Sequence, residues 1–135
     1  MRTFESLASD LEQTGAFSSA EARRTFVLRL VGQLPLTPSE RKWLNIAQQF
    51  AGGWASQDDL EPARTEAWSS LAGKSCDFGD ASVNQRRAVI CALYPDTPAS
   101  EALDEIVNVK ELFVTAGGSE SVAIEILTAT FGAAD

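Results

Sequence analysis

The sequence predicts an all-α protein, a compact bundle of six or seven short helices built on helical hairpins. Three observations predict this class. Apolar residues recur with the 3.6-residue period of an amphipathic helix along most of the chain. Serine, threonine or aspartate stands at most expected helix starts, and glycine or proline at most expected ends. Few residues remain for strands, and no fixed period recurs that would favour a helical solenoid over a bundle.

The first two expected helices cover residues 3–13 and about 19–34. Gly15 follows the first helix, because glycine readily takes the conformation that ends a helix. Ser18 or Ser19 can cap the second helix, and Pro35 stops it.

The third and fourth expected helices, residues 38–51 and 57–71, form the hairpin around which we expect the bundle to be organised. Thr37 with Glu40, and Ser56 with Asp59, have the spacing of a cap followed by a carboxylate three residues later. Between the two helices, Gly52-Gly53 predicts a turn.

All three tryptophans lie in this hairpin. We expect Trp43 and Trp68 in the core, because both lie on apolar helical faces. Trp54 follows the turn. It either plugs the end of the bundle, the favoured reading because large aromatics bury much apolar area, or is exposed as an interface anchor.

The last three expected helices cover residues 80–94, 97–116 and 119–131. Asp80 or Ser82 can cap the first of them, whose segment 88–94 is apolar on nearly every side and predicts a buried central helix. Thr97-Pro98 repeats the threonine–proline start of the third helix, and Ser119 can cap the last.

The length of 135 residues predicts one domain, residues 1–135. No apolar run approaches the ~18 residues that span a bilayer, so we expect no membrane association. The N-terminal segment reads as an amphipathic helix rather than a signal peptide, which predicts a cytoplasmic location.

The formal net charge of −8 is unevenly distributed. Residues 1–53 carry six basic and five acidic side chains, whereas the rest of the chain carries five basic and fourteen acidic ones. This balance disfavours direct binding of nucleic acid, whose backbone is itself negative. It would attract a basic protein partner, or alternatively only keep the protein in solution.

The residue types disfavour an enzyme. There is no histidine, so a serine or cysteine nucleophile has no imidazole base, and two cysteines cannot complete a zinc site. Cys76 and Cys91 are more simply two free thiols, although a disulfide between them stays open. The carboxylates cluster at expected helix starts, where they offset the helix dipole. We therefore expect no catalytic residues, no metal and no cofactor.

Loops on either side of the fourth helix carry the candidate partner-binding residues, because binding residues concentrate in loops. The two loops, 52–61 and 73–80, share a surface only if the chain folds one back toward the other. The candidate residues are Trp54, Asp58, Asp59, Glu61, Asp77 and Asp80.

The segment from Arg41 to Leu71 resembles small all-helical immunity proteins of bacterial toxin–immunity systems. Their hairpins combine an alanine-rich helix, a short glycine-containing turn and a helix of the type L-x-x-A-R-x-x-A-W. The matching residues here are Ala47, Ala51, Gly53, Trp54, Ala55, Leu60, Ala63, Arg64, Ala67 and Trp68, and the segment RRAVICALYP at 86–95 is similar to later helices of that family.

The resemblance implies a protein that binds and neutralises a cognate protein toxin by contact. A toxin that acts on nucleic acid would itself have a basic surface, which suits an acidic inhibitor. Two alternatives stay open: a non-catalytic helical adaptor or scaffold subunit, and a helical domain that binds a small ligand. The sequence identifies neither the partner's activity nor the oligomeric state.

Overall fold

The computed structural model describes residues 2–74 and 78–132. Within these residues the chain forms seven α-helices, two short 3-10 helices and no strand, so the predicted all-α bundle is confirmed. The elements in order are α1 (Phe4–Gln13), η1 (Ala16–Ser18), α2 (Ala20–Val31), α3 (Pro38–Ala51), α4 (Gln57–Ser69), α5 (Ala81–Cys91), η2 (Ala99–Glu101), α6 (Ala102–Thr115) and α7 (Glu120–Phe131).

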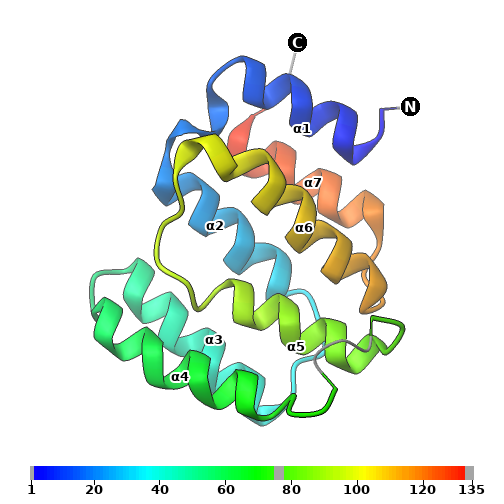
Figure 1. Cartoon of the computed structure of the whole chain (residues 1–135). Coiled ribbons are helices and arrows are strands. Elements are labelled where there is room, and N and C mark those ends of the chain that lie inside the picture. The colour runs from blue at the N-terminus through cyan, green and yellow to red at the C-terminus, as the bar shows by residue number, and fades with distance from the viewer. Residues whose placement is uncertain (1, 75–77, 133–135) are drawn as a thin grey trace.

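The helices divide into two regions (Figure 1). Helix α6 packs against α1, α2, α5 and α7, and α2 also packs against α7. The α3–α4 hairpin lies at the bottom of the view and packs on the rest of the molecule through α2 and α5. Both chain ends lie at the top, on the side opposite the hairpin. Helix α5 is the predicted central helix, with Ala88, Val89 and Ile90 fully buried.

Local capping residues set most helix starts as predicted. The Thr37 hydroxyl accepts a hydrogen bond from the Glu40 N–H at 3.2 Å, and the Glu40 carboxylate accepts one from the Thr37 N–H at 3.0 Å. The Asp59 carboxylate accepts from the Ser56 N–H at 2.8 Å at the start of α4. These bonds satisfy N–H groups that a helix start leaves without a partner.

Helix α4 ends two residues before its predicted end, and two other helices end about three residues early, each ahead of a proline. Helix α2 ends at Val31 rather than near residue 34, and α5 ends at Cys91 rather than near residue 94. Pro35 and Pro95 each disfavour helical geometry in the residue before them. Each helix therefore closes through a short i→i+3 turn, seen in the bonds from the N–H groups of residues 34 and 93 to the carbonyls of residues 31 and 90.

The predicted helix start at Thr97-Pro98 is wrong. The chain forms η2 there, and α6 begins only at Ala102. After Thr37 the third residue is Glu40, which completes the cap, whereas after Thr97 it is Ser100. The Thr97 hydroxyl instead donates to the Glu105 carboxylate, and the Thr97 carbonyl accepts from the Arg23 guanidinium at 2.7 Å. Tertiary contacts therefore occupy the groups that a cap would have used.

Candidate protein-binding surface

Trp54 is the most exposed large apolar side chain of the described residues, at 86%. It lies in the α3–α4 turn, where its N–H donates to the Gln49 carbonyl at 2.8 Å. Gly53 takes a positive φ of 81°, so the chain reverses there and carries Trp54 outward. The favoured prediction that Trp54 plugs the end of the bundle is therefore wrong. Its exposure leaves a large aromatic surface free to contact another molecule.

Three acidic side chains follow Trp54 on the first two turns of α4. Asp58, Asp59 and Glu61 are all exposed. Asp59 is engaged by the Ser56 N–H, but Asp58 and Glu61 form no ion pair with any lysine or arginine among residues 2–74 and 78–132. The positive end of the helix dipole stabilises such carboxylates without neutralising them as a cation would. This end of α4 therefore carries negative charge that a basic partner can bind.

The second predicted loop lies elsewhere. The turn at residues 52–56 precedes α4, whereas the described residues 73–74 follow it, so the two lie at opposite ends of this helix of 13 residues (Figure 1). At 1.5 Å per residue the separation is about 20 Å. The predicted site residues therefore do not form one patch at a single end of the hairpin. Asp77 lies outside the described residues.

Asp80 caps the start of α5, and this role explains its lowered pKa. Its carboxylate accepts hydrogen bonds from the Ser82 hydroxyl at 2.7 Å and from the N–H groups of Ser82 and Val83 at 2.9 and 3.2 Å. These hydrogen bonds lower the pKa of Asp80 below its ordinary value, and the bond from the Ser82 hydroxyl has the largest effect. Asp80 is the N-cap of α5, one of the two residues that the sequence offered for that position.

An exposed aromatic cluster that the sequence did not predict lies near the other end of α4. Trp68 is 39% exposed and Tyr94 is 46% exposed. The Trp68 indole N–H donates to the Tyr94 hydroxyl at 3.1 Å. Arg64 stacks on the Tyr94 ring at 4.7 Å and donates to the Leu93 carbonyl at 2.9 Å.

The prediction that Trp68 belongs to the core is wrong for a geometric reason. The buried positions of α4 are Leu60, Ala63 and Ala67, at the i, i+3, i+7 spacing of one helical face. Trp68 follows Ala67 and is therefore rotated by about 100° from that face. The sequence does contain a signal for this buried face, the spacing of Leu60, Ala63 and Ala67. The adjacent Trp68 obscured it, because a large aromatic residue suggests burial by itself. Trp43, by contrast, is buried as predicted.

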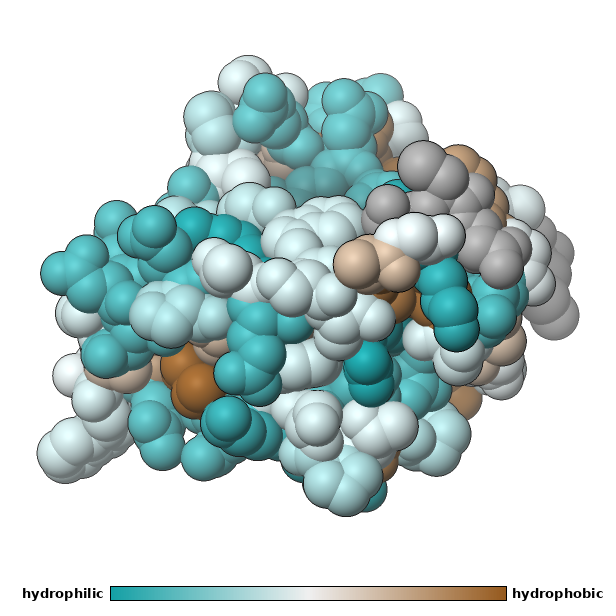
Figure 2. Space-filling model, turned by 60° about the horizontal axis from the view of Figure 1, so that its bottom comes forward, coloured by the Kyte–Doolittle hydropathy of each residue, from teal (hydrophilic) through white to brown (hydrophobic). Residues whose placement is uncertain are grey.

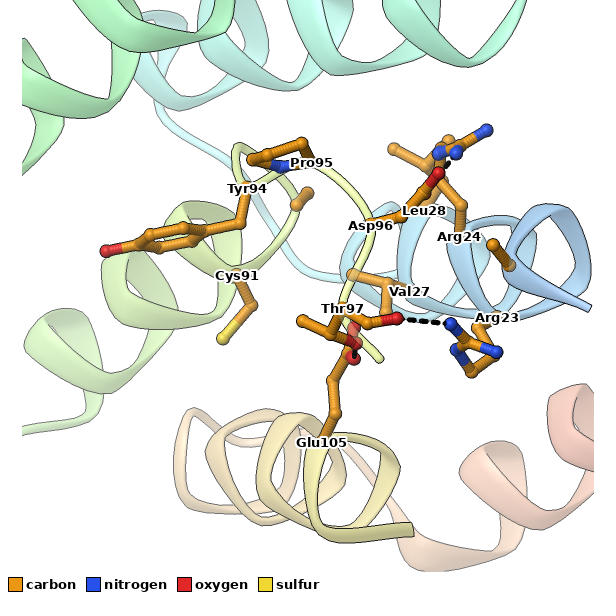
Figure 3. A pocket seen from close by; sticks show the side chains of 12 residues that line it. Arg23, Arg24, Val27, Leu28, Cys91, Tyr94, Pro95, Asp96, Thr97 and Glu105 are labelled. Atoms are coloured by element: carbon orange, nitrogen blue, oxygen red, sulfur yellow. Dashed lines mark hydrogen bonds and ion pairs between the residues drawn. The ribbon is translucent and has the colours of Figure 1, made fainter. Parts of the chain in front are cut away.

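A small, partly open pocket lies between α2, α6 and the segment after α5 (Figure 3). Its volume of about 20 Å³ has room for about one water molecule, not for a metabolite. Arg23, Thr97 and Glu105 converge there through hydrogen bonds, while the Tyr94 ring points away from them.

Cys91 also lines this pocket and carries a free thiol. Burial, and secondarily the nearby Glu105 carboxylate, raises the pKa of Cys91 to about 11. The thiol is therefore protonated near neutral pH and a poor nucleophile there, since the thiolate is the reactive form. Cys76 lies outside the described residues.

The buried carboxylate of Glu40 resembles a functional group but is fully engaged in holding the hairpin. Its side chain is 2% exposed. Beyond its cap bond it accepts from Gln85 at 2.7 Å and from the Arg86 guanidinium at 3.0 Å. Arg86 in turn lies over the Trp43 ring at 5.3 Å. Every oxygen of this carboxylate therefore has a protein partner, which favours a structural role.

The side of the molecule that carries the hairpin is mostly hydrophilic (Figure 2), with hydrophobic side chains in small separate spots. In the part of the chain that the structure describes, no three histidine, cysteine, aspartate or glutamate residues are grouped to hold a metal ion. The same part contains no helix long and apolar enough to cross a bilayer. The sequence matches no protein-family model, and no curated protein and no solved structure matches the chain significantly.

Proposed function

We propose that this chain is an immunity-type inhibitor that binds and neutralises a basic protein toxin by direct contact, without catalysis. The observation that carries the proposal is the exposed Trp54 beside the unpaired carboxylates Asp58 and Glu61. Tryptophan is enriched among the residues that contribute most to binding at protein interfaces, and exposed carboxylates attract a basic partner. The resemblance of residues 41–71 to immunity proteins supplies the class of partner.

At such an interface, charge mainly affects the association rate and a buried aromatic anchor mainly affects the dissociation rate. The formal charge of −8 raises the rate at which a cationic protein meets this surface. Burial of Trp54 in a pocket of the partner would then slow dissociation, since large aromatic anchors contribute much of the binding free energy at protein interfaces.

The test uses the protein encoded by the gene adjacent to the gene for this chain. Co-expression should restore growth of a bacterial host that this neighbour inhibits, and surface plasmon resonance should detect binding. Reversing Asp58 and Glu61 to lysine should slow association and reduce its dependence on salt. Asp59 is left intact because it caps α4.

The matched control reverses Glu12 and Glu125 to lysine. Both are exposed residues on α1 and α7, and the change in net charge is identical. An equal decrease of the association rate in both variants would show a general effect of net charge, and would mean that the interface does not include Asp58 and Glu61. Absence of binding and of growth protection by the wild type would contradict the proposal and favour the helical adaptor.

A further inference from the structure

The outward side of α4 carries a graded stripe of exposed residues. Asp58, Glu61, Thr65 and Trp68 follow the i, i+3, i+7, i+10 spacing of one helical face, and all four are exposed. We call these four residues the outer stripe. It is acidic at the start of the helix, small in the middle and aromatic at the end, over about 15 Å for ten residues of helix.

The acidic end of the outer stripe has acceptors in excess of donors. Asp58 and Glu61 have no basic partner in the described part of the chain. Pro62 lies inside α4 and has no N–H, so the helical bond that the Asp58 carbonyl would accept from residue 62 cannot form. The Asp58 and Glu61 side chains are both exposed about one helical turn apart, and the Asp58 carbonyl is freed from that helical bond, so lysine or arginine has acceptors to bind here.

The aromatic end is fixed in place before any partner arrives. The hydrogen bond from Trp68 to the Tyr94 hydroxyl and the stacking of Arg64 on Tyr94 hold both rings. Rings held in this way lose little conformational freedom on binding, so their contact area contributes fully. Thr65, between the two ends, is small enough for another backbone to approach closely.

We infer that the outer stripe docks one helix of a partner protein, basic at one end and apolar at the other. The inference rests on the proposed function and defines the partner of that surface more narrowly. A stripe of about 15 Å matches about three turns of helix, and two helices pack side by side at about 8–10 Å when the residue between them is small. Basic side chains would lie over Asp58 and Glu61, and apolar ones over Trp68 and Tyr94.

The probe is a hydrocarbon-stapled helical peptide of about fifteen residues, stapled because free helices of this length are marginal in water. Its lysines occupy one end of one face and its leucines the other end. The comparison peptide has the same composition and staple, with lysines and leucines interleaved along that face. Fluorescence anisotropy of the labelled peptides against the full chain should give a dissociation constant at least about tenfold lower for the segregated peptide.

Two substitutions test the stripe itself, each with a matched control. Thr65→Arg places a bulky cation in the middle of the outer stripe and should weaken binding of the segregated peptide about tenfold or more. The control Ala129→Arg, at an exposed position of α7, should leave binding unchanged. Trp68→Ala should weaken it about tenfold or more, whereas Phe78→Ala, at another exposed aromatic, should not. Circular dichroism of each variant checks that the fold is retained.

Equal affinity for the two peptides, or absence of binding by both, would overturn the inference, as would loss of binding that is the same in Thr65→Arg and Ala129→Arg. None of these results bears on the neighbouring-gene protein, whose binding is measured separately. If that protein binds and responds to the Asp58 and Glu61 reversals while the segregated peptide does not bind, the proposed function stands and the helical partner is excluded.

Discussion

The two ends of this molecule are held together by different kinds of contact. Around α1, α2 and α7 the interior is aromatic: the Phe26 ring lies 6.1 Å from Phe4 and 6.0 Å from Phe131, and Phe131 packs edge-on against Phe17 at 4.8 Å. The α3–α4 hairpin buries Trp43 with leucines and alanines, but its border with α5 includes the buried Glu40 carboxylate, which is hydrogen-bonded to Gln85 and Arg86. The exposed Trp54 and Trp68 both belong to the hairpin. The aromatic packing thus lies at one end, and the surface that we propose for partner binding lies at the other.

Single charged side chains illustrate the same difference. Lys110 is buried among α1, α6 and α7, where its ammonium bonds Glu5 and Glu120 at 2.7 Å and Glu111 at 3.2 Å. Burial disfavours the charged form, but the bonds to these carboxylates outweigh it and raise the pKa of Lys110. In the hairpin, the comparable buried charge is Glu40, whose partner Arg86 reaches across from α5. Lys110 thus links α6 to α1 and α7, whereas Glu40 and Arg86 link the α3–α4 hairpin to α5.

The largest expected effect is in the aromatic end. Phe26→Ala removes a fully buried ring that contacts two others, and should lower the free energy of unfolding by about 3–5 kcal/mol. Urea denaturation followed by circular dichroism measures it. A loss below about 0.5 kcal/mol, the level of surface sites, would contradict the assignment of the core to this end.

The second prediction concerns the border of the hairpin. Arg86→Met leaves the buried Glu40 carboxylate without its cation, and should cost about 2–4 kcal/mol, somewhat less than a fully buried pair because Arg86 is partly solvated. Native-state hydrogen exchange should then show faster exchange in α3 and α4 than in α6. Uniform acceleration through all helices would mean that the two regions unfold as one unit.

A smaller effect is expected from acid. The hydrogen bond from Lys110 holds the pKa of Glu5 below its ordinary value of 4.5. A lowered folded-state pKa gives stability that is present above pH 4.5 and is lost as the pH falls through the folded-state value. Because Glu5 is half exposed, the contribution is a few tenths of a kcal/mol. Glu5→Gln should therefore lower the melting temperature slightly at pH 7, and the difference from the wild type should narrow as the pH falls below 4.5.

The smallest effect on stability is expected at Trp54. Trp54→Ala removes an exposed ring and should change the free energy of unfolding by less than about 0.5 kcal/mol. If Trp54 is an anchor, the same change should speed dissociation of the toxin about thirtyfold, the equivalent of about 2 kcal/mol. A large loss of stability with an unchanged dissociation rate would mean that Trp54 stabilises the fold and is not part of the binding surface.

The sequence by itself determined the fold class and where most helices begin. A cap such as Thr37 with Glu40, or Asp80 with Ser82, lies within four residues of the groups it satisfies, so its effect can be read from neighbours in the chain. The acidic character of the α4 start is local in the same sense. These features do not depend on which helix packs against which.

The sequence predicted the burial of Trp43 and of the 88–90 segment, but only the tertiary structure decided which of two adjacent apolar residues is buried and which tryptophans are exposed. Ala67 rather than Trp68 is buried because α3 and α5 both pack on α4 and together fix its buried face, and no single helix specifies that direction. Thr97 failed as a helix start because Arg23, 74 residues earlier in the chain, binds its carbonyl. Trp54 is exposed because no element formed by residues 2–74 or 78–132 covers its side chain. Burial is a property of pairs of segments distant in sequence, whereas capping is a property of one.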